Sequence, residues 1–401
     1  MQRRHLMQRA LALATLPCSA RLYGAAPAGT PRLLLVFLRG GYDATSLLVP
    51  TSSSFYREVR PNIAIAGALP LDADWGLHPA LASSVMPLVT RRQAAFVPFA
   101  GTDDLTRSHF ETQDSIELGQ PLQGRRDFGS GFLNRLAGVL QGSGHDAIAF
   151  TDQLPLVMRG ELSVANLSLK GAPQKPDERL RASLLAMYRD NPLQARVAES
   201  FDVRDEAARQ VAMPSSAASS AMAGEMEAAN RNAINAKGFE LEARRIARLM
   251  RERYALGFVD VGGWDTHVGQ GAATGYLASR LEELGRGLAG FADELGEAAW
   301  RNTVVVVISE FGRTMRENGN RGTDHGHGSA HWVLGGALAA GPVVGERQVV
   351  NATTLNQNRD LPVLNEYRAW IGGLLARQFA LSPAQLDRVF PGATPRDLGL
   401  V

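Results

Sequence analysis

Two acids and two histidines lie near each other in the C-terminal half of the chain, after a run of apolar residues. Glu310 follows the run Thr303 to Ile308, and Asp324, His325 and His327 lie in a glycine-rich stretch shortly after it. Carboxylate oxygens and imidazole nitrogens together are typical ligands of zinc, manganese, magnesium or iron, and the sequence does not choose among these metals. Because ligands in open α/β sheets bind at the carboxyl ends of strands, the stretch predicts one wall of a site for one or two divalent metal ions.

A second acid and histidine follow another apolar run. Asp265 and His267 come after Gly257 to Val261 and the pair Gly262-Gly263. Residues two apart point to the same side of an extended chain, so both side chains could coordinate one ion. The alternative is a surface turn in which Asp265 caps a helix.

Asp43 is a candidate metal ligand of the same kind. It follows the apolar run Leu33 to Leu38 and the turn Arg39-Gly40-Gly41. A carboxylate at this place could hold a cation, and the alternative is that it caps the next helix or turn.

A hydroxyl group that could act as a nucleophile lies in the segment Thr106-Arg107-Ser108-His109, after the apolar run Ala94 to Phe99. Ser108 with Glu111 fits a capping box, which predicts the start of a helix. At a helix N-terminus the alkoxide of Ser108 would be favoured by the helix dipole, and a metal ion would lower its pKa further. Thr106 is the alternative nucleophile, and the adjacent His109 is a further candidate catalytic residue.

Two arginines could bind the oxygens of an anionic substrate. Arg107 directly precedes Ser108, and Arg313 follows Glu310 in the C-terminal stretch. A guanidinium can grip two oxygens of a phosphate or sulfate and can stabilise charge that develops on the transferred group. Together with metal ions, such residues predict hydrolysis of a phosphate or sulfate ester.

These segments must be positioned by the elements around them. The four apolar runs are typical of buried parallel strands, and three of them are followed within a few residues by glycine and an acid, which predicts strand ends at one edge of a sheet. Leu277 to Ala299 has the three-and-four spacing of an amphipathic helix and lies between the last two runs, as in a parallel strand–helix–strand unit. Leu364 to Leu381 predicts another helix, and Ser382-Pro383 starts a short last one.

The predicted fold class is therefore α/β, with a mostly parallel central sheet sandwiched by helices. Residues 160–256 differ in composition, since a Ser/Ala/Met tract at 214–223 lies between polar helical stretches. We interpret residues 160–256 as an inserted helical lobe within a single domain of residues 29–401.

The N-terminus predicts export. Arg3-Arg4 precedes a short apolar stretch, Ala10 to Ala20, and the small residues Ala26-Pro27-Ala28. This pattern is typical of a twin-arginine signal peptide over residues 1–28, and an ordinary secretory signal or a basic amphipathic arm is the alternative. The apolar stretch is too short to span a bilayer, and no later segment reaches about 18 uninterrupted apolar residues. We therefore expect a periplasmic or secreted protein without a transmembrane segment once the signal is removed.

Removal of this leader changes the charge of the chain. Four of the 42 basic residues and none of the 40 acidic ones lie in residues 1–28, so the mature chain is slightly acidic. A slightly acidic chain without a long basic run argues against a nucleic-acid partner. The only cysteine, Cys18, also lies in the leader, which excludes disulfides, thiolate metal ligands and a cysteine nucleophile from the mature chain.

Six segments, in order along the chain, resemble the family known as domain of unknown function 1501. The matching motifs are Arg-Gly-Gly-x-Asp, Gly-Leu-His-Pro, Thr-Arg-Ser-His-Phe, Gly-Gly-Trp-Asp-Thr-His, Ser-Glu-Phe-Gly-Arg-Thr and Asp-His-Gly, all between Arg39 and Gly326. That family looks like a branch of the alkaline phosphatase and sulfatase superfamily. The resemblance implies a mostly parallel sheet between helices, with two cations at the carboxyl edge of the strands.

The resemblance also implies roles for single residues. By position, Asp43 matches the superfamily's first-strand ligand, and Ser108 or Thr106 matches its nucleophile. Asp265 and His267 match its central pair of ligands, and Glu310 matches the acid that follows them. His325 and His327 match its late histidines. Phe311 departs from the pattern because it occupies the place of an expected histidine. Asp324 or His325 would then have to supply that ligand.

The predicted function is an exported, metal-dependent hydrolase of phosphate or sulfate esters, with a small-molecule or polymer-borne ester as substrate. The alternative is a non-catalytic envelope binding or assembly protein that retains a structural metal site and binds a protein partner in the envelope, since a fold does not establish chemistry. The departure at Phe311 favours this alternative.

Overall fold

A sheet of nine strands runs through the protein in this computed structural model, which describes residues 29–123, 126–169, 187 and 229–401. Its order is β12-β5-β11-β10-β1-β9-β6-β7, and β8 pairs with β9. The strands are β1 Arg32–Leu38, β5 Ala94–Gly101, β6 Ala147–Ala149, β7 Ala165–Asn166, β8 Ile234–Asn235, β9 Leu256–Gly262, β10 Thr303–Ser309, β11 Ser329–Gly335 and β12 Asn365–Glu366. Neighbouring strands are parallel except at β11, which is antiparallel to both β5 and β10. The mostly parallel sheet is confirmed.

The four apolar runs of the sequence form β1, β5, β9 and β10, and every residue of these strands is buried. Val36 of β1 pairs with Val307 of β10 on one side and with Val259 of β9 on the other. Alternate residues of β1 enter two separate cores: Leu34 and Val36 lie in one, Leu35 in the other. A strand with apolar residues on both sides must be covered on both faces, which explains why these runs are apolar throughout.

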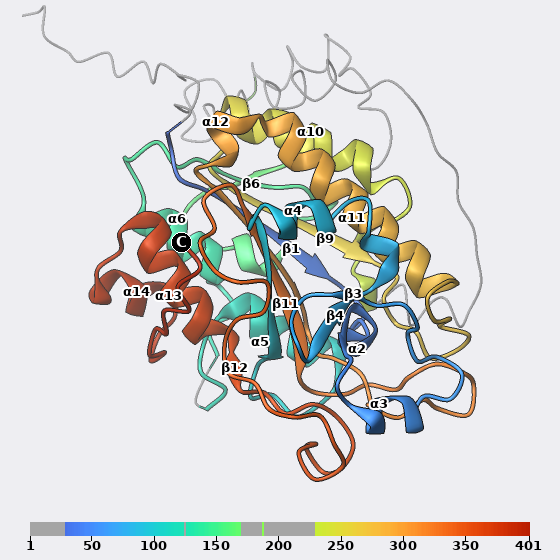
Figure 1. Cartoon of the computed structure of the whole chain (residues 1–401). Helices are drawn as coiled ribbons and strands as arrows, with labels where there is room; N and C mark the ends of the chain where they lie inside the picture. The colour runs from blue at the N-terminus through green and yellow to red at the C-terminus, as the bar shows by residue number, and fades with distance from the viewer. Residues whose placement is uncertain (1–28, 124–125, 170–186, 188–228) are drawn as a thin grey trace, which may run out of the picture.

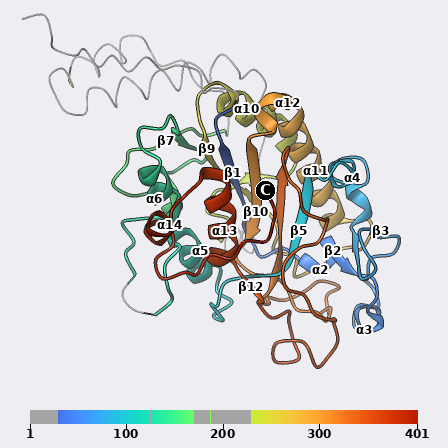
Figure 2. The same cartoon turned by 60° about the vertical axis from the view of Figure 1, so that its left-hand side comes forward.

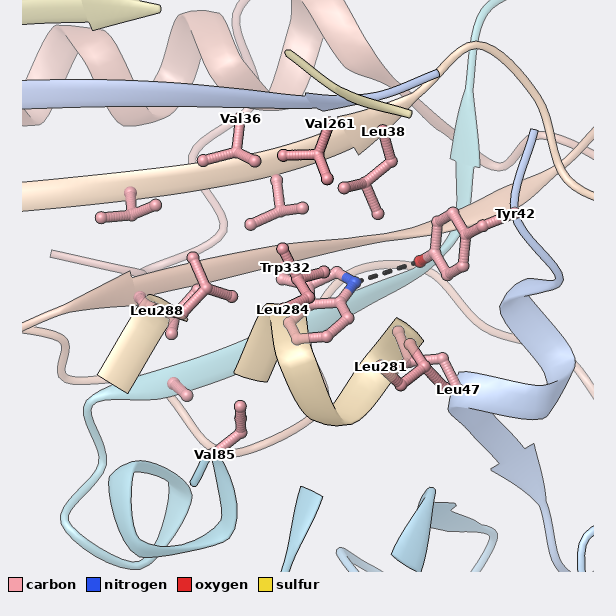
Figure 3. Packing of buried hydrophobic residues seen from close by; sticks show 14 of the residues in the cluster. Val36, Leu38, Tyr42, Leu47, Val85, Val261, Leu281, Leu284, Leu288 and Trp332 are labelled. Atoms are coloured by element: carbon pink, nitrogen blue, oxygen red, sulfur yellow. Dashed lines mark hydrogen bonds between the residues drawn. The ribbon is translucent and has the colours of Figure 1, made fainter. Parts of the chain in front are cut away.

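Helices cover both faces of the sheet (Figure 1, Figure 2). On one face, α10 (Phe239–Glu252) and α11 (Tyr276–Leu295) pack against each other and against the sheet. On the other face lie α5 (His109–Leu118), α6 (Phe132–Val139), α13 (Tyr367–Phe379) and α14 (Pro383–Val389). Figure 3 shows Leu281, Leu284 and Leu288 of α11 in the same core as Val36 of β1 and Trp332 of β11. Each such leucine contributes about 1.5–3 kcal/mol by its burial.

The expected helices are present with adjusted ends. The helix expected at 277–299 is α11, which stops at Leu295 because Gly296 has a positive φ of 80°, and the short α12 (Glu297–Trp300) follows it. The helix expected at 364–381 is α13. The last helix, α14, begins with a capping box between Ser382 and Gln385.

Smaller elements surround the main sheet. A second sheet of three strands has the order β2-β4-β3. The remaining bounds are α2 Ala44–Leu47, β2 Leu48–Pro50, α3 Ser54–Glu58, β3 Leu69–Pro70, β4 Trp75–Leu77, η1 Pro79–Leu81, α4 Met86–Thr90 and η2 Leu156–Met158. Within the described ranges, no helix is long and apolar enough to cross a membrane.

Two predicted segments fall largely outside the described residues. The leader, residues 1–28, is one of them, and most of the proposed helical insertion at 160–256 is the other. The described ends of that range belong to the main domain: β7 and β8 are strands of the sheet, and α10 packs on α11. Whether the residues between them form a helical lobe stays a prediction.

Parallel pairing brings four strand ends to one edge of the sheet. β1 is parallel to β9 and β10, and β5 runs in the same direction as β10 because β11 is antiparallel to both. The segments after β1, β5, β9 and β10 therefore leave the sheet at the same edge. All the sequence motifs with candidate ligands lie in these segments.

Candidate metal centre

Three histidines and one aspartate meet at this edge, and we call His109, Asp265, His267 and His325 the His–Asp cluster. Ligand atoms of His109, Asp265 and His325 all lie within 4.8 Å of one another, and among the described residues no other group of three or more such side chains could hold a metal ion. The Oδ1 atom of Asp265 lies 3.0 Å from His267 Nε2 and 3.4 Å from His325 Nε2. The Nε2 atoms of His267 and His325 are 3.0 Å apart.

Three strand ends supply the four side chains. His109 is the first residue of α5, after β5; Asp265 and His267 follow β9; and His325 lies in the loop after β10. Gly40, in the turn after β1, lets this turn lie against the segment after β9, since a Cβ on Gly40 would be 2.7 Å from the Asp265 nitrogen. The cluster is therefore composite, as the strand-end motifs predict.

The outer nitrogen of each imidazole is held by an oxygen. His109 Nδ1 is 2.8 Å from Glu310 Oε1, His325 Nδ1 is 3.1 Å from the Arg107 carbonyl, and His267 Nδ1 is 3.1 Å from Asp324 Oδ1. Carbonyl and carboxylate oxygens accept hydrogen bonds, so each Nδ1 donates and the Nε2 of the neutral ring keeps its lone pair. Histidine ligands of metals are held in this way.

The inner nitrogens differ in their partners. His109 Nε2 is buried without a hydrogen bond, since the nearest Asp265 oxygen is 3.7 Å away, too far for one. His267 Nε2 and His325 Nε2 lie near each other and near Asp265 Oδ1. A divalent cation would satisfy His109 Nε2 together with Asp265 and His325, so these three residues fit a metal ion. Imidazole-rich sites suit zinc, iron and similar transition metals, whereas magnesium prefers oxygen ligands.

Charges in and behind the cluster are strongly coupled. Burial alone would raise the pKa of Asp265, but the three histidines and Arg313 outweigh it and hold this pKa far below its usual value. Burial would lower the pKa of His109, and Asp265 and Glu310 outweigh this effect and raise it to about 9. Burial would raise the pKa of Glu310, and its contact with His109 lowers it to about 2. The site thus favours positive charge at its centre.

Phe311 forms a wall of the cluster. Its ring lies 4.9 Å from the His109 ring and 5.0 Å from the His325 ring, measured between centroids. Gly41, with a φ of 62°, faces Phe311 so closely that a Cβ would lie 2.3 Å from the ring. The aromatic ring therefore packs beside the ligands in the place where the resemblance implies a histidine.

Both arginines expected to bind substrate are engaged by the protein itself. The Arg313 side chain is buried and donates to Asp265 and to the carbonyls of Gly40, Gly41 and Thr323. Arg107 Nε and Nη2 lie 3.1 and 3.0 Å from the buried Asp360 carboxylate. The predicted role of either guanidinium in orienting an anion is not supported, because each already has an anionic partner.

Asp43 lies in a polar network of its own, outside the His–Asp cluster. Its carboxylate accepts from Arg60 Nη1 at 2.5 Å, from Ser46 Oγ at 2.6 Å and from Gln270 Nε2 at 2.7 Å. Burial would raise the pKa of Asp43, but Arg60 outweighs it and lowers this pKa to about 2. Asp43 thus already has a buried cationic partner, and its expected role as a metal ligand stays a prediction.

Three further predicted ligands, Glu310, Asp324 and His327, lie outside the His–Asp cluster, and the two acids each contact one of its histidines. The Glu310 carboxylate is fully buried and accepts from four donors, His109 among them. Asp324 accepts from His267 and from Asn318 Nδ2 at 3.0 Å. His327 is buried, which lowers its pKa, and it lies outside the cluster. Glu310 and Asp324 thus hold imidazoles where direct coordination was expected.

Ser108 immediately precedes His109 as the N-cap residue of α5, but its side chain makes no capping hydrogen bond. The expected capping box with Glu111 is therefore absent, and the hydroxyl is not committed to the helix. Thr106 Oγ1 accepts from the Ser108 nitrogen at 3.4 Å and lies 3.4 Å from Thr112 Oγ1. Of the two candidate nucleophiles, Ser108 has the less engaged hydroxyl.

The sequence analysis did not predict that Arg60 and Gln113 contact candidate site residues. Arg60 lies in a polar stretch far from any histidine, so only the fold shows its contact with Asp43. Gln113 contacts Glu310, and the one available signal is its spacing of four residues from His109, which places both on one side of α5.

The family described as Protein of unknown function (DUF1501) matches residues 30–390. No curated protein matches the chain. Among solved structures, a protein in the alkaline phosphatase superfamily from Vibrio parahaemolyticus is 12% identical, with a TM-score of 0.36 over 78% of this chain and 62% of that chain. A sulfatase from Pseudoalteromonas sp. is 11% identical, with a TM-score of 0.36 over 78% of this chain and 64% of that chain. The alkaline phosphatase from the Antarctic bacterium TAB5 is 9% identical, with a TM-score of 0.28 over 76% of this chain and 92% of that chain.

The chain spans less than two thirds of the length of the first two of these structures. The expected family is confirmed. We assign roles to residues from the geometry of this chain alone.

Proposed function

The chain belongs to the family described as Protein of unknown function (DUF1501), and we propose that it is an exported, metal-dependent hydrolase of phosphate or sulfate esters. The observation that carries the proposal is the His–Asp cluster, in which ligand atoms of His109, Asp265 and His325 meet while the Nδ1 atoms of both histidines are held from behind. A cation in this group would also give the buried His109 Nε2 the partner that it lacks.

A bound divalent ion would supply a Lewis acid that polarises an ester oxygen and favours the deprotonated form of a hydroxyl. The protein's own contribution is positional. Arg313 fixes Asp265 from one side, and Glu310 fixes His109 from the other. Ser108, next to His109 and free of a capping bond, is the residue we assign as nucleophile.

The proposed site holds one ion. A second ion would need further carboxylates, and Asp43, the natural choice, is already neutralised by Arg60, with both side chains at most 1% exposed. A fixed guanidinium thus supplies positive charge where a second cation would otherwise be required. This supports a stoichiometry of one metal ion per chain.

Metal analysis and an ester screen test the proposal together. Purified mature protein should contain about one transition-metal ion per chain and should hydrolyse some member of a panel of phosphate monoesters, phosphate diesters and sulfate esters. Ser108→Ala should abolish turnover and keep the metal, whereas Asp265→Ala should lose both. A protein that binds no metal, or whose activity survives both substitutions, is not this enzyme.

The proposed export is tested separately. Joint replacement of Arg3 and Arg4 by lysine should leave the protein in the cytoplasm if the leader is of the twin-arginine type. Normal export of this variant would favour the ordinary secretory signal.

A second candidate function is a non-catalytic envelope protein with a structural metal and a protein partner. The observation that favours it is the engagement of Arg107 and Arg313, which leaves neither arginine to bind an anionic substrate. In that case Ser108→Ala would retain the cellular role, and Asp265→Ala would remove it through loss of the metal.

A further inference from the structure

A chain of buried polar side chains lies behind His109. Glu310 Oε1 accepts from His109 Nδ1 at 2.8 Å and from Gln113 Nε2 at 2.9 Å. Gln113 Oε1 in turn accepts from Arg39 Nη1 at 2.9 Å. Glu310, Gln113 and Arg39 are each at most 1% exposed, so no solvent competes for these hydrogen bonds.

The far end of this chain is anchored by two acids. Arg39 Nη2 lies 2.9 Å from Glu117 of α5, and Arg39 Nε lies 2.7 Å from Asp260, a residue within β9. These contacts fix the plane of the guanidinium, and its remaining nitrogen, Nη1, then meets Gln113. Arg39 itself directly follows β1, so the chain connects the sheet to the first residue of α5.

The chemistry of the amide gives the chain a direction. A guanidinium has only donors, so the oxygen of Gln113 must face Arg39 and its NH2 group must face Glu310. The second hydrogen of this NH2 group reaches the Ala229 carbonyl at 2.9 Å. Glu310 Oε1 is thereby held in place as an acceptor for His109.

We propose that Glu310 and Gln113 are positioning residues, which hold His109 with its Nδ1 hydrogen toward Glu310 and its Nε2 lone pair toward Asp265 and His325. The inference rests on the proposed function in so far as His109 is a metal ligand. A carboxylate can only accept, so the opposite tautomer would place two acceptors 2.8 Å apart. Partners of this kind typically change metal affinity 10- to 100-fold, roughly, when they are lost.

Two substitutions of Glu310 separate positioning from packing. Glu310→Gln keeps the size of the side chain and one acceptor, because the Gly40 nitrogen and Gln113 Nε2 both donate to Oε1 and hold the amide oxygen toward Nδ1. Glu310→Met is similar in length, but it offers no oxygen to Nδ1. A positioning role predicts that Glu310→Met binds metal less tightly than Glu310→Gln, whereas a packing role predicts that the two variants bind it alike.

The measurement is Co²⁺ affinity, by competition with a chelating dye, together with the visible spectrum of bound Co²⁺ in the full mature chain. Glu310→Met and Gln113→Leu should lower the affinity by about 10- to 100-fold and alter the spectrum, whereas Glu310→Gln should change both less. The control is Glu294→Gln, which makes the same change to a partly buried carboxylate of α11 that pairs with Arg248 and takes no part in this chain. This control should keep the wild-type affinity even if it lowers the thermal unfolding midpoint.

Failure of the inference is distinguishable from failure of the proposed function. If the wild type binds Co²⁺ and Glu310→Met binds it as tightly, or Glu294→Gln loses as much affinity as Glu310→Met, the positioning role is wrong. If the wild type binds no Co²⁺, the proposed function fails, and nitrogen NMR of metal-free protein at alkaline pH decides the inference. His109 should then carry its proton on Nδ1 in the wild type and in Glu310→Gln and on Nε2, toward Asp265, in Glu310→Met, and the same tautomer in all three proteins overturns the proposal.

Discussion

Arg60 and Asp43 form an ion pair from which water is excluded. Both side chains are at most 1% exposed, and Arg60 also donates to the Met315 and Thr314 carbonyls at 2.7 and 2.9 Å. The pair therefore ties the turn after β1 to the loop after β10. Removing one partner of a buried ion pair strongly destabilises the fold, because the other charge stays buried without compensation.

Arg60→Met should lower the free energy of unfolding by about 3–5 kcal/mol, because it leaves the Asp43 carboxylate buried without a counter-charge. Urea unfolding of the metal-free protein measures this. Arg57→Met is the matched control, since Arg57 is an exposed arginine three residues earlier, and it should change stability by less than about 0.5 kcal/mol. Equal effects of the two substitutions would show that the buried pair is not special.

His331 in β11 is a second residue with a clear energetic signature. It is fully buried, neither ring nitrogen has a hydrogen-bond partner, and burial lowers its pKa to about 3. An unfolded histidine titrates near pH 6.5, roughly, so between these values the unfolded chain binds the extra proton. Stability must then rise with pH across this window, by up to about 1.4 kcal/mol per pH unit.

His331→Leu should flatten the dependence of unfolding free energy on pH between the folded-state value of about 3 and the unfolded value. Denaturant unfolding at a series of pH values measures the slope. Trp332→Phe, the neighbouring substitution, should lower stability at every pH and leave the slope unchanged. A slope that persists in His331→Leu would mean that other groups, such as the buried carboxylates, account for acid unfolding.

At the scale of elements, α5 and α14 begin in different ways. Ser382 caps α14 with a complete capping box, whereas the Ser108 side chain makes no capping bond to α5. The same residue type at the same helix position thus has a structural role in one case and an unengaged hydroxyl in the other.

Ser382→Ala should lower the free energy of unfolding by about 1 kcal/mol through loss of the cap. Ser108→Ala should change it far less, because no capping hydrogen bond is lost. Chemical denaturation of both variants gives the comparison. A large loss of stability in Ser108→Ala would contradict the observed geometry, and it would also make this substitution a poor test of nucleophilic catalysis.

The sequence predicts most of the elements but not all of their directions. Apolar runs such as Thr303 to Ile308 identify β1, β5, β9 and β10 because strands buried on both faces must be apolar throughout. The antiparallel direction of β11 has no local signal, since pairing partners are set by the whole chain. The capping box expected at Ser108 fails for a related reason: matching residue types allow this bond but do not require it.

For the molecule as a whole, the His–Asp cluster joins segments that follow three different strands. The sequence predicts Asp265, His267 and His325 as ligands and places His109 beside them. The sequence cannot tell which acid is a ligand and which one holds His109. Asp265 faces His109 Nε2 and Glu310 faces His109 Nδ1, and only the structure shows this difference. That choice depends on side-chain orientations of a few ångströms, which spacing along the chain does not encode.

A metal ion that joins three segments should stabilise the whole fold. Zn²⁺ at about 100 times its dissociation constant should raise the free energy of unfolding by about 2.7 kcal/mol, since it binds the folded state alone. Thermal unfolding with and without EDTA measures the difference. Asp265→Ala should abolish it, whereas Asp114→Ala, a partly exposed aspartate of α5 paired with Arg231, should retain it. Stabilisation that survives in Asp265→Ala would place the metal elsewhere.

The positions of the ligands along the chain also determine when the cluster can form during folding. His109 is synthesised early, but His325 comes more than two hundred residues later, after β9, α11 and β10. Contacts so distant in sequence form late, because the intervening elements must be in place before the ends can meet. The cluster can therefore be completed only on a nearly finished fold. For a protein that crosses a membrane already folded, as we propose, the metal is selected from the ions available where the chain folds, before it reaches the compartment where it acts.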